Sequence, residues 1–240
     1  MIEGLLEKYL QGKPAATVLD VGPGYGNFSR VAAQATGATK VTYLDCSRAV
    51  LDWQAEECRK AGIETEELQM ELDPGSVSTL RGRYDLILCQ EVLEHLVDPK
   101  GVLRALTSRL SPGGRFVITV PTQRSERWLK RINPRYMRDE PHGHVQQFDE
   151  PGLRTLLNSA GLVPIVFVPT QPHYFLRHTW VFGTRMRVEG STGRIMTQGF
   201  RRFVSGRLTE YSRRFFLATG PRFWGRLLAR NYFVIAVPAL

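Results

Sequence analysis

Short runs of β-branched residues alternate with helical patterns from Thr17 to about Gly161, and this alternation limits the fold more than any other feature. It is typical of a parallel sheet with helices wound over both faces. We therefore expect a doubly wound, Rossmann-like α/β fold with a seven-stranded, mostly parallel sheet. The predicted strands are residues 17–21, 40–44, 67–70, 84–89, 115–120, 164–168 and 232–237.

Three of the predicted helices have recognisable ends in the sequence. Ser, Thr, Asp and Asn favour the first position of a helix, and Gly favours the position after its end. Pro is tolerated in the first turn. The expected start and end signals are Ser47 and Gly62, Asp98 and the Ser-Pro-Gly-Gly of 111–114, and Asp149 and Gly161.

The segment 170–230 separates the last two predicted strands and is too long for a structureless loop in a compact domain. Hydrophobic residues recur every three or four positions between Met196 and Phe215, which predicts an amphipathic helix. We expect one domain over residues 1–240, with 170–230 as a helical insertion that covers the substrate side of the site.

The net charge of +9 lies almost entirely at the end of the chain. Residues 171–240 hold 12 Arg, no Lys and two acidic residues, together with 13 of the 24 aromatic residues. Residues 1–170 are nearly neutral. The basic, aromatic segment is therefore expected to have a task different from that of the first part.

The three cysteines stand at spacings that suggest neither a disulfide framework nor a CxxC metal pair. We expect free thiols in a reducing cytoplasm and no metal ion. The first 13 residues carry charges where a signal peptide needs an apolar segment. No apolar run approaches the ~20 residues that span a bilayer.

A glycine-rich turn follows the first predicted strand, in the stretch Val18-Leu-Asp-Val-Gly-Pro-Gly-Tyr-Gly-Asn-Phe. Glycines are needed where the backbone bends tightly and comes close to a ligand. Their spacing is GxGxG, not the GxGxxG of dinucleotide-binding proteins. Asp20, just before the turn, suits a cationic ligand better than pyrophosphate. A plain strand–helix turn is the alternative interpretation.

A second acidic residue, Asp45, ends the next strand, 19 residues after Gly26. In nucleotide-binding α/β sheets an acid at this place binds the ribose hydroxyls. A helix-capping role is the alternative, but Ser47 already supplies a cap. Together the two elements resemble the class I S-adenosylmethionine (SAM)-dependent methyltransferases.

The resemblance continues through Tyr84-Asp-Leu-Ile-Leu-Cys-Gln-Glu-Val-Leu-Glu-His-Leu-Val-Asp-Pro and Leu110-Ser-Pro-Gly-Gly-Arg-Phe-Val-Ile-Thr-Val-Pro. It ends with His144-Val-Gln-Gln-Phe-Asp-Glu-Pro-Gly-Leu. This order is similar to the ubiquinone-biosynthesis O-methyltransferase type and related small-molecule methyltransferases. It covers residues 15–168 and the last strand, but not 170–230.

The resemblance implies a set of SAM-binding residues. The glycine turn would line the methionine part, with Asp20 near the amino group, and Asp45 would hold the ribose. The adenine would lie near 70–72, where Asp73 leaves the register open. The implied cofactor-binding residues are Asp20, Gly22, Pro23, Gly24, Tyr25, Gly26, Asp45, Cys46, Met70, Glu71, Leu72 and Gln90.

Histidine is the first candidate for a base, because its pKa lies near neutrality and a hydroxyl acceptor must lose a proton. The resemblance places His144 in a loop facing the cofactor cleft, with His142 two residues away. Packing or capping is the alternative for both. For His95, Glu91 and Glu94 we favour structural roles over catalysis.

The arginine-rich segment allows three interpretations: a solvated helix face, a site for an anionic acceptor, or a contact with an anionic membrane surface. The absence of Lys and the many aromatics argue against the first. We expect a small or lipid-linked acceptor, anionic in part, and a cytoplasmic protein with peripheral contact at the inner membrane surface. A basic cluster at 124–138, in the loop after the fifth strand, points the same way.

The favoured function is methyl transfer from SAM to a hydroxyl oxygen. Nucleic-acid methylation is the first rival, suggested by the basic pI. The Cys-Gln-Glu-Val after the fourth strand does not match the motif expected for methylating base amines, so a nucleic-acid partner is not favoured. A SAM-binding scaffold without catalysis is the second rival, and an NAD-dependent oxidoreductase is the third. Oligomeric state is left open.

Overall fold

The computed structural model describes residues 2–134, 136, 143–172, 174–175, 210–215, 218 and 227–239. Within these ranges the chain forms one seven-stranded sheet in the order β3-β2-β1-β4-β5-β7-β6. The strands are β1 (Thr17–Val21), β2 (Lys40–Asp45), β3 (Glu64–Gln69), β4 (Tyr84–Gln90), β5 (Leu110–Pro121), β6 (Leu162–Thr170) and β7 (Asn231–Pro238).

Six strands run in the same direction, and β7 lies antiparallel between β5 and β6. The predicted doubly wound, mostly parallel α/β fold is thus confirmed. The central strands are buried on both faces, as their uninterrupted apolar sequences predict: β4, for example, is almost fully buried from Leu86 to Gln90.

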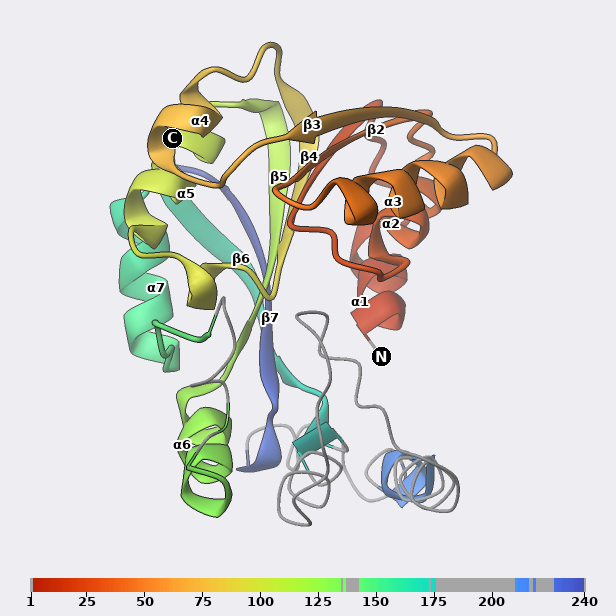
Figure 1. Cartoon of the computed structure of the whole chain (residues 1–240). Coiled ribbons are helices and arrows are strands. Elements are labelled where there is room, and N and C mark those ends of the chain that lie inside the picture. Colours follow the sequence, from red (N-terminus) through yellow and green to blue (C-terminus); the bar gives the residue numbers. More distant parts are fainter. Residues whose placement is uncertain are drawn as a thin grey trace.

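Helices cover both faces of the sheet (Figure 1). On one face, α1 (Ile2–Leu10), α2 (Phe28–Thr36) and α3 (Arg48–Lys60) bury residues such as Leu6, Ala33 and Leu51 against the strands. On the other, α4 (Pro74–Ser78), α5 (Pro99–Thr107) and α7 (Glu150–Ser159) bury Val77, Leu103 and Leu157. A short 3-10 turn, η1 (Leu93–His95), follows β4, and α6 (Gln123–Ile132) follows β5.

The helix starts agree with the capping signals in two cases out of three. The carboxylates of Asp98 and Asp149 accept backbone N–H groups at the starts of α5 and α7. Ser47 stands at the start of α3, but its side chain makes no capping hydrogen bond; its backbone N–H donates to Asp45. The sequence interpretation of Ser47 as a side-chain cap is therefore wrong.

Other boundaries differ from the predictions. The third strand is residues 64–69 and not 67–70. The helix that starts after Asp98, α5, ends at Thr107 and not at 111–114, which belong to β5. The basic cluster expected in a loop after the fifth strand falls on α6 as far as Arg131, and Arg135 and Arg138 lie outside the described residues. Most of the predicted 170–230 insertion, including most of the 196–215 helix, also lies outside them; residues 210–215 are helical.

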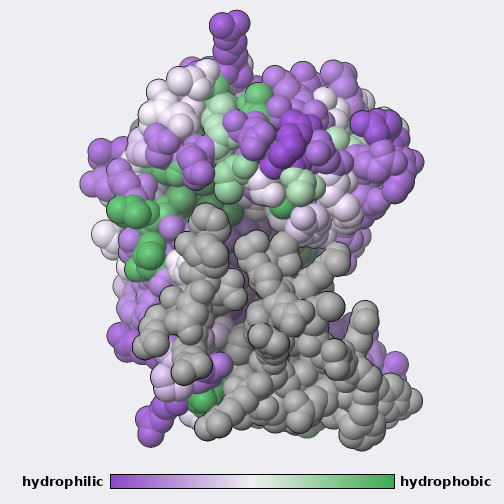
Figure 2. Space-filling view, in the orientation of Figure 1, coloured by the Kyte–Doolittle hydropathy of each residue, from purple (hydrophilic) through white to green (hydrophobic). Residues whose placement is uncertain are grey.

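The described surface is largely hydrophilic on the face shown in Figure 2, with hydrophobic residues in small groups. The most exposed large hydrophobic side chains include Val97 and Val145, near the carboxyl end of the sheet. Among the helices of the described part, none has both the length and the hydropathy that a membrane span requires.

Candidate active site

The glycine turn lies between β1 and α2, at the carboxyl end of the sheet. Gly22 and Gly24 have φ of +61° and +55°, a backbone region that favours glycine. A Cβ on Gly22 would lie 2.6 Å from the Val92 side chain, so the backbone there packs against the segment after β4. A Cβ on Gly24 would meet nothing within 4 Å. The turn is thus tight on one side and open on the other.

Gln54 holds this turn in shape, a role that the sequence did not reveal. It projects from α3, is 1% exposed, and its amide nitrogen donates to the carbonyls of Gly24 at 2.8 Å and Gly26 at 2.9 Å. Tyr25 meets the ring of Trp53 edge-on, with 5.5 Å between centroids. Side chains from the first turns of α3 therefore hold the glycine turn in place.

Asp20 is buried directly beneath the turn. It is 2% exposed, and its carboxylate accepts a hydrogen bond from the Ser29 hydroxyl of α2. Burial raises the pKa of Asp20 to about 7, with the charge of Asp45 adding to the effect and Ser29 opposing it. A nearby cationic group would favour the ionised form of this carboxylate.

Asp45 ends β2 beside the glycine turn, since Leu44 accepts the N–H of Gly22 at 2.8 Å. One Asp45 oxygen accepts the N–H of Ser47 at 2.8 Å, which orients the side chain. Cys46, which follows Asp45, is exposed, whereas Cys89 near the end of β4 is buried in the core.

The segment expected at the adenine follows β3. Asp73 caps α4 by accepting the N–H groups of Gly75 and Ser76, and the hydrogen bond from the Ser76 hydroxyl, followed by these N–H bonds, lowers its pKa. Asp73 thus serves as a helix cap, and the contact of residues 70–72 with the adenine stays a prediction. Met70 and Leu72 are partly buried against the core.

Gln90 and Glu91 stand where β4 ends. Gln90 is 8% exposed, and neither polar atom of its side chain has a partner among the described residues. Glu91 has a φ of +56°, and one carboxylate oxygen accepts from Asn231 at 2.8 Å and from Thr119 at 3.1 Å. Burial raises the pKa of Glu91, opposed mainly by the charge of Arg230.

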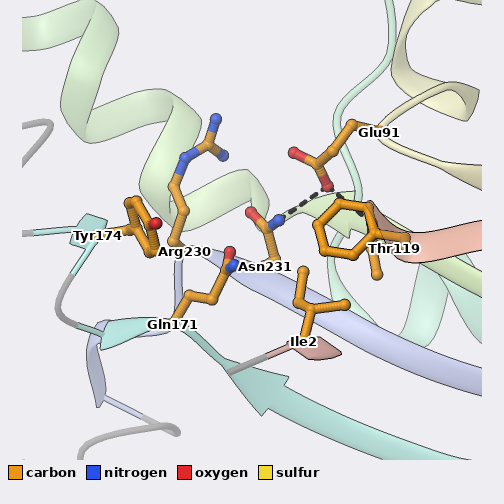
Figure 3. A pocket seen from close by; sticks show the side chains of 8 residues that line it. Ile2, Glu91, Thr119, Gln171, Tyr174, Arg230 and Asn231 are labelled. Atoms are coloured by element: carbon orange, nitrogen blue, oxygen red, sulfur yellow. Dashed lines mark hydrogen bonds between the residues drawn. The ribbon is translucent and has the colours of Figure 1, made fainter. Parts of the chain in front are cut away.

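A cavity of about 200 Å³ opens beside Glu91 (Figure 3). Its lining combines apolar side chains from α1 and α2 with polar ones from the ends of β5, β6 and β7. Phe28 also contacts the glycine turn, because a Cβ on Gly26 would lie 3.1 Å from its ring. The lining residues are Ile2, Phe28, Glu91, Thr119, Gln171, Tyr174, Arg230 and Asn231.

A buried network extends from the cavity into α6. Arg230 lies 3.1 Å from a carboxylate oxygen of Glu126 and donates to the Tyr136 hydroxyl at 3.0 Å. The other Glu126 oxygen is 2.7 Å from Nδ1 of His144. Burial alone would raise the pKa of Glu126, but His144 and Arg230 bring it below its usual value.

Of the two predicted base candidates, the structure describes His144 alone. His144 is nearly buried and is linked to it through Glu126 and Arg230, but it is not among the lining residues. His142 lies outside the described residues. The network residues Glu126, Tyr136 and Arg230 were missed, since they carry no local motif.

Glu94, His95 and His144 form a tight cluster, with one ligand-type atom of each within 4.8 Å of the others. The carboxylate of Glu94 is 1% exposed and without a hydrogen-bond partner in the described structure. Burial, and then Glu91, raise its pKa well above the usual value. A metal ion would find its ligands here, although none was expected from the sequence.

A family model described as a methyltransferase domain matches residues 2–165. The chain belongs to this methyltransferase family. With the sheet described above, the match makes it a SAM-dependent methyltransferase.

Two curated relatives are ubiquinone biosynthesis O-methyltransferases. That of Erwinia tasmaniensis is 29% identical over 67% of this chain and 65% of its own length. That of Escherichia coli O7:K1 is 33% identical over 48% of this chain and 47% of its own. The matched part thus spans less than two thirds of either relative.

Solved structures with the same fold include proteins of different named activity. The [4+2]-cyclase SpnF covers 100% of this chain and 81% of its own at a TM-score of 0.62 and 15% identity. The N-methyltransferase NodS of Bradyrhizobium japonicum covers 100% and 95% at 0.57 and 13%. A SAM-dependent methyltransferase of Clostridium acetobutylicum covers 93% and 84% at 0.55 and 12%. At these identities the likeness concerns the fold alone.

Proposed function

We propose that this methyltransferase transfers the methyl group of SAM to a hydroxyl oxygen of a small-molecule, sugar or lipid-linked acceptor. The observation that carries the proposal is the cavity beside the glycine turn, which shares the Phe28 side chain with it. A cofactor above the turn and an acceptor in the cavity would be neighbours, as in-line transfer requires. The names of the curated relatives favour oxygen as the receiving atom.

The cofactor-binding set proposed is the one implied by the sequence, and two observations fit it. The open side of Gly24 leaves room for a ligand against the backbone. The amide of Gln90, which has no partner among the described residues, and the carboxylate of Asp20, whose pKa is about 7, offer polar groups at the carboxyl edge of the sheet. Asp20 would face the amino group and Asp45 the ribose. SAM supplies the activated methyl group, and the chain holds the two reactants in line.

Calorimetric titration with S-adenosylhomocysteine (SAH), the demethylated product, tests the cofactor site. We expect micromolar binding that weakens by about 2 kcal/mol in Asp45→Ala. A folded protein that does not bind SAH would overturn the proposed function.

His144 is the proposed base, with Glu126 holding its Nδ1 and thereby fixing which nitrogen carries the proton. Because His144 does not line the cavity, the reacting hydroxyl would have to extend toward α6, where its proton would pass to His144 as the oxygen gains the methyl group. Turnover of His144→Ala decides the assignment once an acceptor is in hand. A loss of about 100-fold or more is expected from general-base catalysis, and unchanged turnover eliminates it.

A second candidate is a SAM-binding protein without methyl transfer, which the fold shared with a [4+2]-cyclase favours. Transfer of a radioactive methyl group from SAM to a mixture of hydroxylated small molecules separates the two. SAH binding without label transfer to any acceptor would favour the second candidate.

The basic residues of α6 favour a negatively charged group on the acceptor or on a surface near it. On α6, Arg124, Arg127 and Arg131 are exposed together with Trp128, at the end of the molecule where 170–230 leaves the sheet. We propose that this surface and 170–230 contact an anionic membrane or the phosphate of a lipid-linked acceptor, at the cytoplasmic side. Vesicles with anionic lipid should retain the protein at low salt, and vesicles of neutral lipid should not. Equal behaviour with both kinds would remove the membrane part.

A further inference from the structure

Two residues other than glycine have a positive φ in the described part of the chain, Glu91 at +56° and Gln171 at +59°. Both line the cavity of Figure 3. Left-handed backbone is unfavourable for residues with a Cβ, and it persists chiefly where the surrounding structure holds a side chain for function. The coincidence marks this cavity, and not another surface, as a built site.

The carboxylate of Glu91 is held by one oxygen and open at the other. Oε1 accepts both hydrogen bonds, from Nδ2 of Asn231 at 2.8 Å and from Oγ1 of Thr119 at 3.1 Å. Oε2 accepts none from a described residue. Figure 3 shows this second oxygen turned away from Asn231, toward the side of the cavity where Arg230 lies.

Asn231 presents a second acceptor to the same space. A carboxylate can only accept from Asn231, so the amide nitrogen faces Glu91 and Oδ1 faces the other way. Asn231 is 3% exposed, and its Oδ1 has no hydrogen-bond partner among the residues that the structure describes. Buried acceptors without a partner are unfavourable, so a ligand that donates to Oδ1 and to Glu91 would remove that cost.

The charges around the cavity disfavour an anion inside it. Among the described lining residues the one cation is Arg230, which is already beside Glu126 and the Tyr136 hydroxyl. Two acidic residues are also present: Glu91 lines the cavity, and Glu94, which follows it closely in the sequence, is buried. A second anion would therefore be buried without a counter-charge, which is strongly unfavourable.

We propose that Glu91 and Asn231 bind the methyl acceptor, and that the cavity selects an uncharged molecule bearing hydroxyl groups over an anion of similar size. Ile2 and Phe28 contact its carbon skeleton, while the two oxygen acceptors take its hydroxyl hydrogens. The proposal rests on the proposed function and assigns a ligand chemistry to its cavity. Any anionic part of the acceptor lies outside, near the arginines of α6.

Phenol and benzoate test the selection, because they have similar rings and differ in charge. Each is titrated by ligand-observed NMR into the full-length protein saturated with SAH. We expect phenol to bind about ten-fold more tightly than benzoate, equivalent to about 1.4 kcal/mol. Equal affinities, preference for benzoate, or no binding of phenol would overturn the proposal.

Glu91→Gln tests the residue itself, since it keeps the shape and removes the charge. We expect phenol binding to weaken about ten-fold and the preference over benzoate to shrink toward equality. Glu57→Gln, which removes a carboxylate on the surface of α3, is the matched control and should behave as the wild type. Wild-type behaviour of Glu91→Gln would overturn the proposal. If that variant does not fold, the wild-type preference alone decides.

The SAH titration separates this proposal from the proposed function. Absence of SAH binding rejects the methyl-transfer function. SAH binding without the expected phenol preference rejects only the role given to Glu91 and Asn231.

Discussion

The two sides of the candidate site are built in different ways. On the glycine-turn side, the proposed cofactor residues lie in three short segments, 20–26, 45–46 and 70–72, with Gln90 close by. On the cavity side, hydrogen bonds join groups far apart in the chain: Glu91 and Asn231 are separated by 140 positions. A site made from local turns leaves a motif in the sequence, whereas one made from long-range contacts between single residues does not.

The largest difference between the two sides should appear in stability. Glu126→Gln removes the carboxylate beside Arg230 and leaves that guanidinium buried, which should cost about 3–5 kcal/mol in the free energy of unfolding. Chemical denaturation of the ligand-free protein measures it. Glu57→Gln, in an ion pair of partly exposed side chains, should cost at most about 1 kcal/mol. Similar losses in both variants would mean that the buried network is not special.

Gly22→Ala should damage the turn by more than its backbone conformation alone explains. Its φ is positive and its Cβ would press on Val92, with overpacking adding about 1–3 kcal/mol. Gly12→Ala is the control, because Gly12 has a φ of +70° and open space around its Cβ. We expect both variants to lose stability but only Gly22→Ala to lose SAH binding. If both bind SAH equally, the close approach at Gly22 is not part of the cofactor site.

Asp45→Ala should weaken SAH binding by about 2 kcal/mol, the cost of a lost hydrogen bond to a charged group. Asp73→Ala removes another carboxylate of the same region, one that caps α4. It should lower stability by about 1 kcal/mol and leave SAH affinity unchanged. The opposite pattern in calorimetry would move the ribose contact from Asp45 to Asp73.

The smallest effect expected is a pH dependence from Asp20. Its pKa of about 7 means that at pH 6 most molecules must lose a proton before Asp20 can pair with a cationic amino group. SAH affinity should therefore rise about ten-fold from pH 6 to pH 8, with proton release on binding. For the folding stability of the ligand-free protein, the pH dependence has the opposite sign. The native state retains a proton that the unfolded chain loses near pH 4, so this group's contribution to stability falls as pH rises from about 4 to 7.

Calorimetry in buffers of different ionisation enthalpy measures the released proton directly. Asp20→Asn should remove both the proton release and the pH dependence. A wild-type affinity that stays constant across this range would place the amino group elsewhere.

The sequence was sufficient for the sheet and for the glycine turn. Alternating apolar runs fixed the order of elements, and capping by Asp98 and Asp149 was visible because it acts within one turn of helix. It was not sufficient for β3, whose charged residues follow no apolar run, so its start was placed three residues late.

The cavity side was partly visible and partly not. His144 was singled out in the sequence because histidine is a common base. Glu126 lies among the basic residues of α6, and Arg230 lies in an arginine-rich segment, so neither stood out in the sequence. Only the folded chain shows that Arg230 is buried, whereas Arg213 and Arg214 are exposed. We predicted a structural role for Glu91 because acidic residues are common near the starts of helices. Its positive φ could not be predicted from the sequence.

The joining of β6 and β7 has a consequence for how such a protein can change. Thr170 and Asn231 are register partners, and the backbone of Arg230 donates to Thr170 at 3.0 Å and accepts from Thr122 at 2.9 Å. The intervening stretch thus leaves and rejoins the sheet at one place. Doubling its length would cost only about 0.6 kcal/mol in loop-closure entropy. Exchange of this stretch would replace Gln171 and Tyr174 in the cavity lining while Arg230 and Asn231 stay in place, so the acceptor side could change without altering the half proposed to hold the cofactor.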